Sequence, residues 1–556
     1  MEPTACQKVF AIQEIVSLIC FESFEPYFPK KTRFASLLAL SRTSKIFTEP
    51  ALDRLWWEQK SLAPLIKCMP EDAWEEHVAG TGRNATTTLH LRRPLKSTDL
   101  PRMLYYSERI RELCLTRFAS PKLHHGLLRA LDMALPVRTF MPKLVDLTWC
   151  SSRKDVTTIL RHILGPRVRN IHLNLDNTEE LSILPFVRSA CPQVSDFELV
   201  LPQNSQGSTP VVSDLVCGWE NLTDLYIPNL DKAGFIHIAH LSSLNTLNLW
   251  FVDDLAPSHP PDFLVGPSFP KLEYLSIRCR TANFCAGVVQ VIASRQLTSL
   301  SISPMSSWTS SAWQKLHTVI QECLDHTALD SIEVKDWDGL VRPAEDELAS
   351  YRISLDVLRP LLAFKRLEQV AYQTYPDVDV GDDFLEEMAK AWPRLSSLHL
   401  CNEVLITQPP RATLRCLLPF ARHCRHLEAL GIRIHARNIP AFTQLAGHRI
   451  AHELQYMYVG TSYLLSWDDM EGKVAAFISD LFPTLDSLMT SSEELPEALA
   501  SHRASWDRVS CLLPVFLSVR SQEKKFWTEE LKVDDSDEEY TSEEGSREEG
   551  EDGDVS

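Results

Sequence analysis

A six-residue pattern of apolar and polar positions recurs through most of the chain. Its first, fourth and sixth positions are apolar, with Thr86 as the exception, and the positions between are mostly polar. The alternation at its end is typical of a strand with one buried face, because successive side chains of a strand point to opposite sides. Such segments begin at Thr86, Ile110, Leu144, Val168, Val194, Leu222, Leu244, Leu272, Leu297, Leu329, Leu367, Leu395, Leu427 and Leu454.

These segments follow one another at about 28 residues on average, within the roughly 20–29 residues of leucine-rich repeats. Between them lie helical stretches such as 181–190 and 384–391, which end before Pro192 and Pro393 because proline cannot continue a helix. We therefore predict an α/β solenoid over residues 86–462, in which each repeat packs on its neighbours. The uneven spacing and the mostly missing asparagine after the strand indicate an irregular horseshoe.

The first sixty residues have a different, helical pattern. Ile12, Ile15 and Ile19 lie at helical spacing, and a second apolar set begins at Leu37. Pro26 and Pro29 interrupt the pattern, and the Glu49–Pro50 step predicts a second turn. Three short helices in residues 1–60 bury too little apolar surface to be robust alone, so a partner or the next domain has to cover them. Residues 61–85 are expected to be a linker.

Three segments of this helical part resemble the F-box of fungal, basidiomycete-type F-box proteins with leucine-rich repeats: Val9–Ile15, Leu37–Phe47 and Glu49–Trp56. The resemblance continues into Leu62–Ile66 and Arg92–Leu95, although Gln13 stands where the family usually has proline. It implies docking on a Skp-type adaptor and, through that adaptor, on a cullin. The implied contact residues are Ile12, Ile15, Ile19, Leu37, Leu40, Leu52 and Leu55. The alternative for each of them is a place in the core of the helical unit itself.

Beyond the repeats, the chain has two further parts. The stretches 474–485 and 504–517 have helical patterns, and we expect residues 463–531 to form a helical cap over the open end of the solenoid core. Residues 532–556 are acidic and almost free of apolar side chains, which predicts a disordered tail.

The net charge of −18 is mostly a property of that tail, which holds 12 Asp and Glu against the single Arg547 between Val533 and Ser556. The mildly acidic remainder gives no electrostatic reason to expect nucleic acid or an anionic membrane as a partner. The N-terminus has no signal-peptide pattern, and the apolar stretch 15–21 is too short to span a membrane. We expect an intracellular protein of the cytoplasm, the nucleus or both.

Sequence motifs that would indicate catalysis are not found. The sequence has no phosphate-binding glycine loop, no His-Glu-x-x-His, no Gly-x-Ser-x-Gly and no Cys-x-x-Cys among its 14 cysteines. The His124–His125 pair gives only a weak indication of a metal, because adjacent helical residues point in different directions. We expect no enzymatic activity, no cofactor and no metal, so any ubiquitin transfer would take place on partners.

The outward face of the predicted strands offers a surface for a protein substrate. Residues flanking the fourth position of each segment point away from the core, and along the seven segments from Ile110 to Leu272 they begin acidic and become aromatic. Such a surface suits a basic segment with an aromatic anchor. The residues predicted to bind are Asp196, Glu198, Asp224, Tyr226, Asn248, Trp250, Tyr274 and Arg278. The alternative is an ordinary solvated face on which a loop covers Trp250.

Two hypotheses of function follow from the sequence. The first is the substrate-recognition subunit of a cullin–RING, SCF-type ubiquitin ligase. The second is a leucine-rich-repeat interaction scaffold that does not engage a ligase. Co-purification with a Skp-type adaptor distinguishes them.

Overall fold

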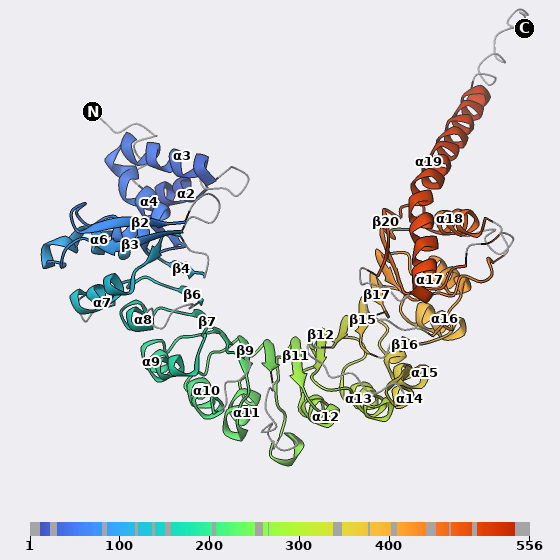
Figure 1. Cartoon of the computed structure of the whole chain (residues 1–556), viewed down its shortest axis with the longest axis horizontal. Coiled ribbons are helices and arrows are strands. Elements are labelled where there is room, and N and C mark those ends of the chain that lie inside the picture. The colour runs from blue at the N-terminus through green and yellow to red at the C-terminus, as the bar shows by residue number, and fades with distance from the viewer. Residues whose placement is uncertain are drawn as a thin grey trace, which may run out of the picture. The chain divides into compact units, whose positions relative to one another are not determined.

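A computed structural model describes residues 12–22, 30–80, 86–116, 120–135, 139–150, 157–202, 207–250, 260–264, 266–336, 347–375, 378–401, 408–440, 452–465, 467, 469–491 and 497–539. The chain divides into two compact units, Met1–Arg280 with Gln290–Gln296 and Thr281–Val289 with Leu297–Ser556. Fifteen parallel strands follow the chain order, eight in the first unit and seven in the second (Figure 1). A mixed α/β repeat fold is thereby confirmed.

The first unit contains a ladder of short strands that pair without register shifts. Leu147, Ile171 and Phe197 are opposite one another in this ladder and are fully buried, so the apolar fourth position of each segment faces the core as predicted. The strands are β1 (Glu58–Gln59), β4 (Glu112–Leu115), β6 (Asp146–Cys150), β7 (Asn170–Asn174), β8 (Asp196–Val200), β9 (Asp224–Pro228), β10 (Thr246–Trp250) and β11 (Tyr274–Cys279).

The helices that alternate with these strands lie on one side of the ladder (Figure 1). Several start at a proline or at a side-chain cap, as in α11, where Asp231 accepts a hydrogen bond from the Gly234 amide at 2.8 Å. They are α6 (Pro101–Ser107), α7 (His125–Ala134), α8 (Thr157–Ile163), α9 (Leu184–Ala190), α10 (Thr209–Val216) and α11 (Lys232–Ala239). Helix α12 (Ala282–Val291) is divided between the two units.

The second unit repeats the same strand–helix plan. Its strands are β12 (Ser299–Pro304), β13 (Ser331–Lys335), β15 (Gln369–Gln373), β17 (Ser397–His399), β18 (Ala429–Gly431), β19 (Tyr456–Gly460) and β20 (Ser487–Thr490). Its helices include α13 (Ser310–Cys323), α14 (Leu348–Tyr351), α15 (Leu355–Leu358), α16 (Asp382–Ala391) and α17 (Leu417–His423). Strand β20 pairs with β19, so the strand series continues one repeat beyond the predicted boundary at residue 462.

The predicted start of the solenoid at Thr86 is wrong. Strand β3 (Thr86–Leu91) lies in a separate three-stranded sheet, antiparallel to β2 (Trp74–Ala79) and parallel to β5 (Lys122–Leu123). The hydrophobic pattern correctly identifies Leu89 as buried but does not say which sheet it joins, and β2 is the nearest partner along the chain. The expected linker 61–85 accordingly contains β2 and the short helix α5 (Ala63–Ile66).

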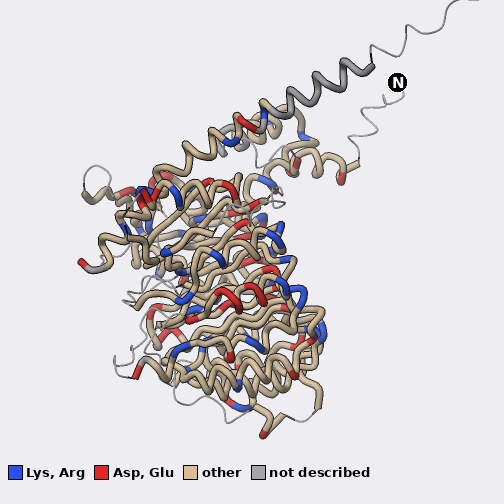
Figure 2. The backbone as a smooth tube through the Cα atoms, turned by 90° about the vertical axis from the view of Figure 1, so that its right-hand side faces the viewer, with Lys and Arg blue, Asp and Glu red and all other residues tan. Residues whose placement is uncertain are grey.

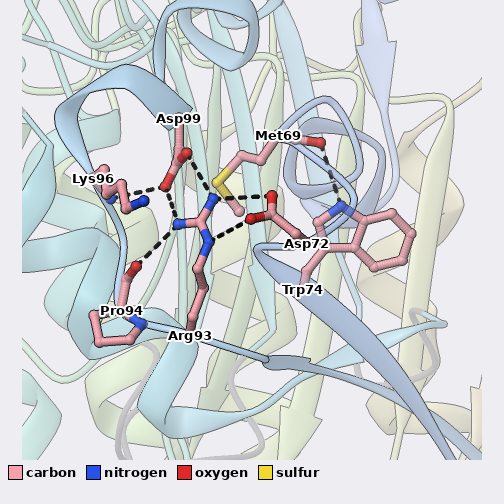
Figure 3. Close-up of polar contacts among 7 residues, drawn as sticks. All are labelled: Met69, Asp72, Trp74, Arg93, Pro94, Lys96 and Asp99. Carbon is pink, nitrogen blue, oxygen red and sulfur yellow. Dashed lines mark hydrogen bonds and ion pairs between the residues drawn. The ribbon is translucent and has the colours of Figure 1, made fainter.

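A half-buried arginine, Arg93, joins this small sheet to the chain that follows it. The Arg93 guanidinium donates to Asp72 at 2.8 and 3.0 Å and to Asp99 at 2.7 and 3.0 Å (Figure 3). It also donates to the Pro94 carbonyl at 3.1 Å. These bonds hold the pKa of Asp99 at about 2, so the carboxylate remains charged at neutral pH.

Two helices complete the C-terminal part of the second unit, α18 (Met470–Leu481) and α19 (Glu497–Glu539). Arg520 of α19 reaches α18, where it donates to Ser479 at 2.9 Å and to Asp480 at 2.5 Å. Helix α19 extends into the stretch predicted as a disordered tail, as far as Glu539; residues 540–556 lie outside the described part. Among the described helices, none is long and apolar enough to cross a membrane.

A buried histidine links two helices to a strand in the second unit. His317 of α13 donates through Nδ1 to the Val357 carbonyl at 2.7 Å, and its Nε2 accepts from the Tyr372 hydroxyl at 2.9 Å. Both ring nitrogens are therefore used by the neutral imidazole. Complete burial lowers the pKa of His317 to about 4.

We expect acid to destabilise the second unit through His317. Between pH 6.5 and 4 the unfolded chain binds a proton at this position and the folded chain does not. The free energy of unfolding therefore decreases as the pH is lowered, and at pH 5 it is about 2 kcal/mol below its value at neutral pH. The His317→Gln variant should be less stable than the wild type at pH 7.5, but its free energy of unfolding should decrease less between pH 7.5 and 5. Thermal unfolding at both pH values checks this, and an unchanged pH dependence in the variant contradicts it.

Candidate functional site

The N-terminal residues form three helices: α2 (Gln13–Glu22), α3 (Lys30–Thr43) and α4 (Lys45–Trp56). Their shared core contains Cys20, Leu37 and Ala51. The second turn lies at Ser44, whose side chain caps α4, and not at Glu49–Pro50 as predicted. Pro50 is accommodated inside α4.

The predicted adaptor-binding residues do not share one surface. Leu37 is fully buried, and Leu40 and Leu55 pack against the same core, so these three serve the helical unit itself. Ile15, Ile19 and Leu52 are half-buried. Only Ile12 of the seven is exposed, at 46%. The alternative of internal core residues therefore holds for Leu37, Leu40 and Leu55.

A further set of apolar side chains on these helices is exposed to solvent. Leu18 is 57% exposed, Leu38 44% and Ile46 51%, and Phe21 and Phe34 are also exposed. The sequence contains a signal for part of this set, since α2 carries apolar residues around its whole circumference and a helix in a small unit can bury only one side. Apolar side chains left in water on so small a unit are candidates for contact with a partner.

The helical unit is attached to the first solenoid repeat by Arg109. Its side chain is 8% exposed, and the guanidinium forms ion pairs with two residues of α4, Glu49 at 2.5 Å and Asp53. The Tyr105 hydroxyl also donates to Glu49 at 2.8 Å. The hydrogen bond from Arg109 lowers the pKa of Glu49.

Aromatic contacts and the sheet itself strengthen this attachment. Trp56 stacks on Tyr106 with ring centroids 4.6 Å apart, and Trp57 Nε1 donates to Glu112 at 2.7 Å. Strand β1 begins directly after Trp57 and pairs with β4. Helix α4 therefore continues into the sheet without a spacer.

The outward strand positions of the first unit form continuous rows across the sheet. In the first row Asp146, Asn170, Asp196 and Asp224 are successive register partners, followed by Thr246 and Tyr274. In the second row His172, Glu198, Tyr226, Asn248 and Ser276 are partners, and in the third Trp250 pairs with Arg278. All eight residues predicted to bind substrate belong to these rows and are half-buried. The predicted shared face is thus present.

Acidic side chains dominate the β6–β9 part of this face. His172 bonds Glu198 at 2.8 Å through Nδ1 and lies 3.7 Å from Asp196 through Nε2. Asp196 stands opposite Asp224 in the register. Burial raises the pKa of Asp196, His172 opposes this rise, and the carboxylates of Asp224, Asp146 and Glu198 add to it.

Aromatic side chains dominate the β9–β11 part. The Arg278 guanidinium lies 5.3 Å from the centre of the Trp250 ring. Burial raises the pKa of Tyr226, and Asp224 and Asp196 contribute to the rise. The face therefore changes from carboxylates to aromatic rings and one cation over a few strands.

The described residues contain no group of three or more His, Cys, Asp or Glu that could hold a metal ion. His124 instead caps α7 by accepting from the Gly126 amide, and its ring stacks on that of His90 with centroids 4.2 Å apart.

No protein-family model matches the sequence, and no curated protein matches it. Among solved structures, the chain is similar to one from the crystal structure of the Rad7 and Elc1 complex in yeast, with 12% identity over 72% of this chain and 85% of that chain and a TM-score of 0.37. Likeness at this level establishes neither a common family nor a shared function.

Replacement of Arg109 tests the attachment of the helical unit. Arg109→Ala leaves Glu49 and Asp53 without their cation. Because both carboxylates are half-exposed, we expect the free energy of unfolding to fall by about 1–3 kcal/mol, less than for a fully buried ion pair. Helices α2–α4 should become sensitive to protease before the solenoid does. Arg188→Ala, which removes the surface pair with Asp214, is the matched control and should change little. Equal protease resistance of both variants contradicts the assignment.

Proposed function

We propose that this chain is the substrate-recognition subunit of a cullin–RING, SCF-type ubiquitin ligase. The helices α2–α4 would bind a Skp-type adaptor, which would connect the chain to a cullin, and the outward strand face would bind a protein substrate. The chain itself would catalyse no reaction.

The observation that carries this proposal is the exposed apolar set on a small helical unit that is firmly joined to a solenoid. A unit of three helices has little core of its own, yet Leu18, Leu38 and Ile46 are largely outside that core. Leaving such side chains in water is unfavourable by about 25 cal/mol per Å² of apolar surface. A partner that covers them recovers this free energy, and the F-box resemblance of the same helices favours a Skp-type adaptor.

We infer that the exposed residues make the contact, and of the predicted set only Ile12 is among them. The docking surface would depend indirectly on the core residues Leu37, Leu40 and Leu55, because they hold the three helices together. Ile12, Leu18 and Leu38 would make the contact itself. Substitution of the first group would unfold the unit, whereas substitution of the second group would leave it folded.

Charges placed on the exposed set should abolish adaptor binding. In the Leu18→Asp/Leu38→Asp variant the contact would have to bury two unpaired carboxylates, so we expect at least a 100-fold loss of affinity. The measurement is co-purification of a Skp-type adaptor with the full chain. Val78→Asp is the matched control, because Val78 is 64% exposed on β2, outside the three helices, and should retain wild-type binding.

Thermal unfolding of the three proteins shows whether each is folded. Undiminished adaptor recovery with the folded double variant contradicts the docking surface. If the wild-type chain recovers no Skp-type adaptor at all, the interaction scaffold without a ligase becomes the better account.

A further inference from the structure

We propose that the strand face of the first unit binds an extended protein segment in which a Lys or Arg lies about four residues from an aromatic or large aliphatic side chain. This inference rests on the proposed function, since it defines the class of substrate that the receptor would recognise. It is argued from the rows of side chains on β6–β11.

The first step is the unbalanced charge on β6–β9. Within the described residues, Asp146, Asp196, Glu198 and Asp224 form no ion pair with Lys or Arg; the only ion-pair partner of this group is His172. Other acidic residues of the same unit are paired, as in Asp132 with Arg161. Acidic and basic positions are also interspersed along the backbone in the view of Figure 2. The face thus has charge available for a cationic partner.

The second step is the energetic cost of this arrangement. Asp196 and Asp224 are opposite each other on adjacent strands, where like charges are destabilising. One carboxylate oxygen of Asp196, Oδ1, is buried and has no hydrogen-bond partner among the described residues. A guanidinium or ammonium group from a partner would relieve the repulsion between the two carboxylates.

The third step is a comparison with the equivalent positions of the second unit. These are mainly Ser, Gln, Ala and Tyr, as in the register partners Ser331, Gln369 and Ser397, with one acid, Glu333, and one base, Lys335. Solvated strand faces in this fold therefore do not need to be acidic. The carboxylates on β6–β9 are a particular property of the first unit.

The fourth step fixes the spacing of the bound segment. Three strand intervals separate Glu198 on β8 from Tyr274 on β11, a distance of about 14 Å at roughly 4.8 Å per interval. An extended chain covers this distance in about four residues. A basic side chain over Asp196, Glu198 and Asp224 thus places a side chain four residues away near Trp250 and Tyr274.

The fifth step fixes the orientation. Arg278 lies against the Trp250 ring, so the aromatic end of the face already carries a cation. A second basic side chain at that end would be repelled, whereas an apolar one can pack on the exposed part of the rings. The basic residue therefore belongs over β8 and β9, and the apolar anchor belongs over β10 and β11.

Synthetic peptides test this inference on the full chain. The probe is a fluorescein-labelled Gly/Ser peptide that contains Arg-Arg and a Phe four residues after the second Arg. A second peptide has the same residues in the reverse order. We expect one direction to bind in fluorescence anisotropy and to weaken at least tenfold between 50 and 500 mM salt. A Glu-Glu peptide and a peptide with Phe directly after Arg-Arg should each bind at least tenfold more weakly.

Two variants separate the two ends of the face. Asp196→Asn/Asp224→Asn should weaken the Arg-Arg peptide at least tenfold, flatten its salt dependence and leave the melting temperature equal or higher, because a like-charge pair is removed. Trp250→Ala should weaken binding several-fold with the salt dependence retained. Glu333→Gln, which removes a carboxylate from the same kind of strand position in the second unit, is the matched control and should bind normally.

The inference is overturned if no Arg-Arg peptide binds, if the Glu-Glu peptide binds equally well, or if the double Asn variant retains wild-type affinity. Adaptor recovery distinguishes this failure from failure of the ligase role. Loss of peptide binding with intact adaptor recovery removes only the substrate class, whereas peptide binding without adaptor recovery leaves the face valid on an interaction scaffold.

Discussion

The central apolar side chain of each strand can be covered only by the neighbouring repeats, and this constraint determines most of the structure. Leu147, Ile171 and Phe197 are fully buried because the strands stack in register, so that each residue meets its equivalent in the next repeat. A shift of the strand register by one residue would expose these side chains to water. The same register necessarily aligns the outward residues in rows, which is how carboxylates far apart in sequence become neighbours.

The first repeat of the first unit and the last repeat of the second unit each lack a neighbour on one side. At the N-terminal end β1 pairs with β4, and helix α4 with its partners lies beside the first repeat, held by Arg109. At the C-terminal end α18 and α19 pack together, and Arg520 joins them. End structures of this kind are required in solenoids, because an uncovered terminal repeat would expose its core.

The sequence predicts the strands and their outward residues well because both depend on local periodicity. The eight face residues from Asp196 to Arg278 lie where alternation places them. The pattern at Thr86 predicts a strand of the solenoid, whereas β3 lies in another sheet, because periodicity records burial and not pairing partners. Leu37 is buried although the resemblance implies an adaptor contact for it, and Leu18 is exposed, because the side of a short helix that is covered depends on tertiary packing. The contact of His172 with Glu198 also could not be predicted, since it depends on side-chain rotamers of residues 26 positions apart.

The direct passage from α4 into β1 has a mechanical consequence. A flexible spacer lets two binding sites explore a volume that grows with its length, and the effective concentration of one site at the other falls accordingly. Here Trp57 is followed at once by a paired strand, so no flexible linker separates the helices from the strand face of the first unit. A partner held by the helices and a segment held by the face would keep a fixed separation, and only those groups of the bound segment that this separation allows would come within reach.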